Sequence, residues 1–240
     1  MTVIVINIFL GLFGFYLVSD CIERDTRTGV GQIIATTPVS RAAYLVGKWI
    51  SSLLVLFVLV LIMAAAAVIM VLFQSKTALD LEALLMPFLA VALPYMALIA
   101  ALAVVFESVP WLRGALGNVA YFFLWLFGLM AVFFVWEKAL PFLPAPLGIN
   151  VFTASLNAGV GAAFPNESIA GMAVGNFTGQ VKLFNWPGLA WNPGIVARQA
   201  LWVVISLGMV LLSASWFARF DPSREGLRRR RGMAKEAKEG

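Results

Sequence analysis

The chain has 240 residues, of which 62% are hydrophobic and 12% charged, and its formal net charge is +5. Ordinary soluble domains have about 45 to 50% apolar and about 25% charged residues, so this composition excludes a water-soluble domain. One cysteine and no histidine exclude an internal disulfide bond, a histidine-containing metal site and a histidine-based catalytic triad.

The first apolar segment, Val3 to Val18, lies at the N-terminus, where a cleaved signal peptide is the competing interpretation. No basic residue precedes the apolar run, and Ser19, Asp20 and Cys21 follow it in place of a small-x-small cleavage site. We therefore expect a retained membrane span, with Cys21 as a packed or interfacial thiol.

Residues 20–48 form a polar, charged segment between two long apolar runs. Val30, Ile33 and Ile34 fall at positions i, i+3 and i+4, so they share one face of a short amphipathic helix. Arg27 lies elsewhere around the same helix. The pattern therefore predicts one short helix on the membrane surface.

A corner is predicted after this helix. Pro38 disfavours the helical conformation at Thr37, so the helix should end there. Ser40 can cap a new helix that continues through Trp49 into the next apolar run. The chain thus forms a helix, a corner and a second helix continuous with a membrane span, so a push on the first can tilt the second.

Leu53 to Phe73 is an unbroken apolar run of 21 residues. At 1.5 Å per helical residue, it is long enough for the roughly 30 Å hydrocarbon core of a bilayer. The same criterion predicts three further spans, at about Ala83 to Phe106, Val119 to Trp136 and Ala200 to Ala218. The expected fold class is all-α, a polytopic helical bundle with five transmembrane helices.

Residues 140–164 are apolar enough to resemble a sixth span, but they are interrupted by Pro141, Pro144 and Pro146 at one end and by Gly159 and Gly161 near the other. Prolines remove backbone donors, and unsatisfied backbone groups in lipid cost several kcal/mol each, which argues against a spanning helix. We expect an extracytoplasmic region here, interfacial or re-entrant, followed by a compact loop at 165–198.

Basic residues are distributed unevenly over the two sides that five spans define, with 13 on the side of residues 20–48 and 4 on the other. Positive charge is retained in the cytoplasm, so the N-terminus is predicted to be outside and the C-terminus inside. The basic tail, 219–240, is expected to be disordered beside anionic membrane lipid, which explains its charge without nucleic acid.

The polar segment also carries a series of short motifs: Glu23-Arg24, Gly29, Gln32-Ile33-Ile34-Ala35, Thr37-Pro38-Val39-Ser40-Arg41 and Tyr44-Leu45-Val46-Gly47-Lys48. In these motifs it resembles the cytoplasmic hinge of type 2 ABC transporter permeases. The resemblance implies an all-helical subunit of a bacterial-type inner (plasma) membrane, which forms homo- or heterodimers and exports its substrate with a separate cytosolic ATPase. The family usually has six spans, whereas this chain begins in the second, as a fragment, a chain with a misassigned start or a true five-span variant would.

The resemblance further implies that the region from Glu23 to Thr36 is a coupling helix that rests in a groove of the ATPase. The partner-binding residues would be Glu23, Arg24, Arg27, Gly29, Val30, Ile33, Ile34, Pro38 and Arg41. A single permease domain, 1–240, would comprise spans at 1–19, 49–74, 83–106, 115–137 and 198–218, the hinge at 20–48, an extracytoplasmic region at 138–197 and the tail at 219–240.

The sequence lacks a phosphate-binding loop, because Gly47-Lys48 is followed by Trp49 and has Ala42 where the first glycine is required. We therefore expect no enzyme activity and no cofactor in this chain, with ATP and Mg²⁺ bound by the partner subunit.

An ion-coupled secondary transporter is an alternative, although the predicted spans lack the ionisable residues that such proteins commonly use. A membrane enzyme would need a nucleophile paired with a base, which the sequence does not indicate. A non-transporting anchor or assembly factor for a cytosolic partner would use the same hinge.

Overall fold

The computed structural model describes residues 2–74, 80–109, 111–164, 186 and 188–217. Over these ranges the regular elements are helices, and five helical segments are long and apolar enough to cross a membrane. This confirms the predicted all-α polytopic bundle. The first segment, Val3–Arg27, takes in most of α1 (Thr2–Val18) and continues beyond it. The other four are α4 (Arg41–Gln74), α5 (Leu81–Pro87) with η1 (Phe88–Ala92) and α6 (Leu93–Ser108), α7 (Ala115–Phe134), and α10 (Pro193–Ser213).

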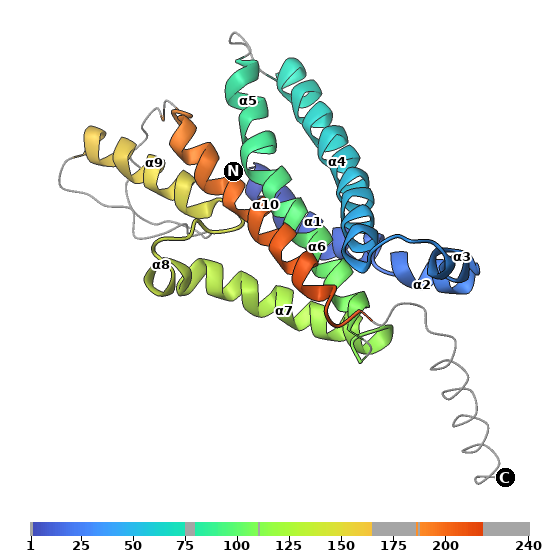
Figure 1. Cartoon of the computed structure of the whole chain (residues 1–240). Coiled ribbons are helices and arrows are strands. Elements are labelled where there is room, and N and C mark those ends of the chain that lie inside the picture. The colour runs from blue at the N-terminus through green and yellow to red at the C-terminus, as the bar shows by residue number, and fades with distance from the viewer. Residues whose placement is uncertain (1, 75–79, 110, 165–185, 187, 218–240) are drawn as a thin grey trace, which may run out of the picture.

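Helix α6 lies at the centre of the bundle, with α1, α4 and α10 around it (Figure 1). Its alanines at positions 97, 100, 101 and 103 are fully buried, and such small side chains let neighbouring helices approach closely. The indole N–H of Trp49, on α4, donates to the Ala97 carbonyl over 2.9 Å. Helix α4 thus packs directly on the backbone of α6.

The third span is continuous but changes its helical geometry part-way. Pro87 ends α5, the π-helical turn η1 follows, and α6 begins with Leu93 and Pro94. A proline lacks an amide donor and crowds the preceding turn, and a π turn is the wider helical geometry that often occurs at such points. The two prolines therefore alter the span without ending it.

The segment after α7 folds back against the bundle. It contains the short helix α8 (Trp136–Ala139), and its residues 144–149 are all buried. The Trp202 indole, on α10, donates to the Pro144 carbonyl over 3.1 Å, and Gly148 packs against Val91 of η1. Helix α9 (Ile149–Ala163) follows and is not among the five candidate spans. Most of the loop expected at 165–198, and the tail at 219–240, lie outside the described residues.

Helix α10 begins earlier than the apolar run predicts. Asn192 caps it by accepting the Ile195 N–H over 2.9 Å, and Pro193 is its first residue. Arg198 therefore lies inside the helix, whereas hydropathy places the start at Ala200. The Asn-Pro pair carries the signal for the helix start that the apolar pattern misses.

Candidate functional site

The hinge between α1 and α4 contains two short helices, α2 (Cys21–Arg27) and α3 (Val30–Thr36). They lie beside the N-terminal end of α4, away from α9 (Figure 1). Gly29 separates them in a left-handed conformation, with φ 78°, which glycine adopts without steric cost. The prediction of one continuous helix across this segment is therefore wrong, because Gly29 breaks it.

The predicted corner is present. Thr37 is extended, with φ −87° and ψ 152°, as expected for a residue before Pro38. The Ser40 Oγ accepts the Ala43 N–H over 3.1 Å and so caps α4, which continues from Arg41 into the second span. The hinge is thus covalently continuous with a transmembrane helix through a single capped turn.

The outer surface of α2 and α3 combines apolar and basic side chains. Ile33 is 67% exposed and Val30 42% exposed, so the shared apolar face of α3 points away from the bundle. Arg24 and Arg27 are exposed on α2, and Arg27 pairs with Glu23 over 2.7 Å. An exposed apolar face rimmed by charged groups is typical of a protein–protein contact surface.

The nine predicted partner-binding residues divide by exposure. Six are exposed: Arg24, Arg27, Val30, Ile33, Pro38 and Arg41. The other three, Glu23, Gly29 and Ile34, are half-buried. We refer to these nine residues as the hinge surface, and their role in binding a partner remains a prediction.

The inner side of α2 is bonded to α4 through a cluster that the sequence did not reveal. The Lys48 ammonium lies 2.7 Å from the Asp25 carboxylate, and the Tyr44 hydroxyl donates to the same carboxylate over 2.7 Å. Lys48 also donates to the Cys21 carbonyl over 3.1 Å. Because both charged side chains are largely shielded from solvent, with 22% and 13% exposed, this contact is stronger than a surface ion pair.

A second connection joins α2 to α6. The Glu107 side chain, in the last turn of α6, accepts the Cys21 N–H over 2.9 Å with one oxygen and the Ile22 N–H with the other. Glu107 is only 7% exposed. Its own carbonyl accepts from the Arg113 guanidinium over 2.6 Å. A buried carboxylate thus satisfies two first-turn amides of α2, which α2 itself leaves without an intrahelical partner.

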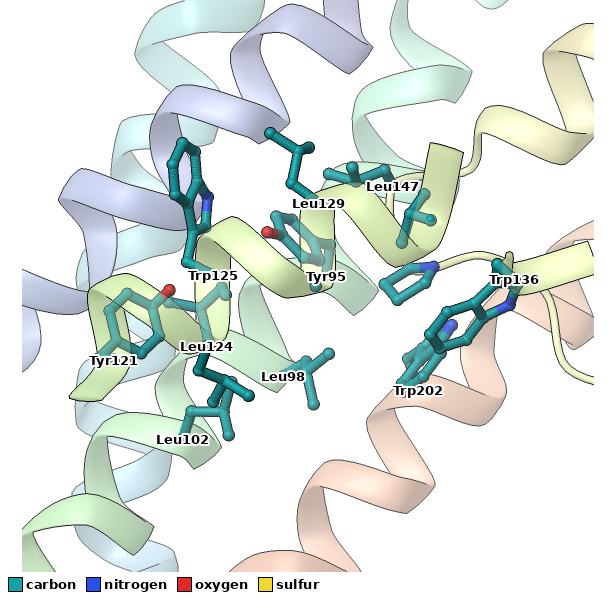
Figure 2. A pocket seen from close by; sticks show the side chains of 14 residues that line it. Tyr95, Leu98, Leu102, Tyr121, Leu124, Trp125, Leu129, Trp136, Leu147 and Trp202 are labelled. Atoms are coloured by element: carbon teal, nitrogen blue, oxygen red, sulfur yellow. The ribbon is translucent and has the colours of Figure 1, made fainter. Parts of the chain in front are cut away.

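An apolar cavity of about 250 Å³ lies between α6, α7, α8 and α10 (Figure 2). Three tryptophans and two tyrosines contribute to its wall, but their polar atoms are largely engaged. The indoles of Trp136 and Trp202 donate to main-chain carbonyls of residues 143 and 144, and the Tyr121 hydroxyl donates to the Gly11 carbonyl. The lining carries no Asp, Glu, Lys or Arg, so the cavity suits an apolar group.

The family model described as ABC-2 family transporter protein matches residues 2–212. The chain belongs to this family. Neither the curated proteins nor the solved structures contain a match. The predicted resemblance to a type 2 ABC transporter permease is therefore confirmed, and with five candidate spans the protein is a multi-pass membrane permease.

The permease's described residues include no group of three or more Cys, Asp or Glu side chains that could hold a metal ion.

The side-chain contacts of α2 fix this helix between two spans. Asp25 and Lys48 connect it to α4, and Glu107 connects it to α6. Sequence reasoning missed these three residues because each contacts residues that are distant in the chain.

Proposed function

We propose that this permease is the membrane subunit of an ATP-driven exporter and that a separate cytosolic ABC ATPase docks on the hinge surface. The exposed apolar face of α3, formed by Val30 and Ile33, supports this most directly. Without a bound partner, these two side chains expose apolar area to water, which is unfavourable by about 25 cal/mol per Å². Contact with a groove of the ATPase would remove that cost, and the arginines around the face would fix its orientation.

Movement of the ATPase is transmitted to the spans because α2 is bonded to α4. A push on the hinge surface acts on α2, whose Asp25 is held by Lys48 and Tyr44 of α4. Since α4 also continues directly from the Ser40 cap, force arrives at its N-terminal turns by two routes. The expected response is a tilt of α4 and alternating access or lateral opening of the permease.

The orientation that fits this function places the hinge surface in the cytoplasm. The uneven count of basic residues favours the same orientation, with the N-terminus outside a bacterial-type plasma membrane.

A second permease subunit, identical or homologous, would complete the transporter. The exposed apolar face of α7, including Phe127 at 66% and Phe134 at 72%, would contact either that subunit or lipid. The apolar cavity favours apolar or amphipathic cargo.

Co-purification tests this function. The tagged permease is co-expressed with a candidate ABC ATPase from the same genome, and Ile33→Asp is compared with wild type and with Trp111→Asp. Trp111 is a matched control, because it is a 72% exposed apolar side chain between α6 and α7, on the same predicted side. We expect Ile33→Asp to lose the ATPase and Trp111→Asp to retain it. An active wild-type preparation without any ATPase would refute the proposal.

A further inference from the structure

The proposed function leaves one contact of the hinge unexplained, the pair of hydrogen bonds between α2 and Glu107 of the central helix α6. Glu107 lies at the end of α6, the helix that contacts α1, α4 and α10. Four residues of α6 also line the apolar cavity: Tyr95, Leu98, Ile99 and Leu102 (Figure 2). Any displacement of α6 would therefore repack the bundle and move one wall of that cavity.

The carboxylate of Glu107 serves α2 in place of a local cap. Asp20 occupies the N-cap position of α2, but it has φ 69° and its side chain makes no capping hydrogen bond. A short polar N-cap side chain ordinarily accepts a first-turn amide from within the same segment. Here two oxygens from another span accept two successive amides, those of Cys21 and Ile22. The first turn of α2 is thus capped by a side chain from the last turn of α6.

Burial makes this connection difficult to break. A carboxylate that is 7% exposed and loses its hydrogen bonds is left in a poorly solvated site, and two amides of α2 lose their acceptor at the same time. Separating α2 from α6 is therefore much less favourable than moving the two together. The bond has two contact points, so it also resists rotation of α2 about a single hydrogen bond.

We propose that Glu107 is a positioning residue that transmits displacement of α2 to α6, and through α6 to the wall of the apolar cavity. The inference rests on the proposed function, in which an ATPase displaces α2. It adds a second route, to the buried central span, beside the route to α4 through Asp25 and Lys48. The substitution that tests it is Glu107→Gln, which preserves the shape of the side chain while removing its charge and one acceptor oxygen.

The experiment uses the full permease–ATPase complex in lipid nanodiscs and measures amide hydrogen exchange with and without ATP and vanadate. In wild type we expect nucleotide-dependent changes both in α2 and in the segment η1–α6. In Glu107→Gln we expect the α2 change to persist and the η1–α6 change to be lost. Glu137→Gln, an exposed glutamate of α8, should respond as wild type does.

The outcomes separate this inference from the proposed function. Failure of wild type to retain an ATPase refutes the function itself. Retention of the ATPase together with an undiminished η1–α6 response in Glu107→Gln overturns only the role of Glu107. If Glu107→Gln does not fold, wild type still tests the inference, because a nucleotide response in α2 without one in η1–α6 would show that the two do not move together and would overturn it.

Discussion

The contact between Asp25 and Lys48 gives a stability prediction that can be derived from its geometry. We consider Lys48→Met, which keeps the aliphatic stem and removes the charge, and Asp25→Asn, which keeps the shape and removes the opposite charge. Each leaves the other partner partly buried, since the side chains are 22% and 13% exposed. Tyr44 still donates to residue 25 in Lys48→Met, so one hydrogen bond to the carboxylate remains.

The size of the effect lies between two limits. An exposed ion pair contributes about 0 to 1 kcal/mol, whereas breaking a fully buried pair by removing one partner costs about 3 to 5 kcal/mol. Partial burial and the remaining Tyr44 bond place each single substitution at about 2 kcal/mol. The double variant leaves neither charge unpaired, so its loss should be smaller than the sum, by about 1 to 2 kcal/mol of coupling energy.

The assay is equilibrium unfolding of the four proteins of this double-mutant cycle in one detergent, with ATPase binding measured in parallel. We expect all three variants to bind the ATPase, because Asp25 lies on the side of α2 that faces α4 and Lys48 is the residue of α4 that it contacts. Strict additivity of the two single losses would refute the reasoning. So would single losses within about 0.5 kcal/mol of zero, the range of an unremarkable surface substitution.

Substitutions at four further sites test the packing of the spans and the start of α4 by unfolding measurements. Gly11→Ala places a methyl group against the Tyr95 hydroxyl at less than van der Waals distance, so it should destabilise the permease by about 1 to 3 kcal/mol; an unchanged midpoint would contradict this packing. Asn7→Leu and Gln199→Leu each remove a fully buried side-chain amide that has no hydrogen-bond partner among the described residues. Each should therefore raise the free energy of unfolding by about 1 to 3 kcal/mol. A lower unfolding midpoint would show that the amides are partnered. Ser40→Ala removes the cap of α4 and should cost about 0.5 to 2 kcal/mol, whereas Ser40→Asp should retain stability.

Local rules predicted the features of the hinge that depend on neighbouring residues. Pro38 restricts only the residue before it, and Ser40 caps only the turn after it, so both effects can be read from the sequence. The spans were predictable for a similar reason, because the length of an apolar run is a local property. Gly29 shows the limit of the periodicity argument, since the spacing of Val30, Ile33 and Ile34 does not show that a glycine separates their helix from Arg27.

Contacts between distant residues could not be predicted in this way. Glu107 is 86 positions from Cys21, and its position at the end of an apolar run indicated only that the span ends there. The cavity likewise depends on how α6, α7 and α10 pack, which periodicity does not determine. A buried glutamate at a span end, opposite a short helix without a local cap, is the pattern that would have identified the contact from a rough arrangement of the spans.

The two connections of α2 have different consequences because they reach helices in different surroundings. Helix α4 presents Leu54, Val58 and Ile62, each more than half exposed, along one face, so it can tilt while that face slides against lipid or another subunit. Helix α6 has no comparable exposed face, and its displacement must change its contacts with α1, α4 and α10 together. Close-packed interiors respond to such a displacement by switching between discrete arrangements rather than by gradual deformation. A push carried by Glu107 would therefore change the apolar cavity in a step, while a push carried only by Lys48 would be partly absorbed at the edge of the bundle.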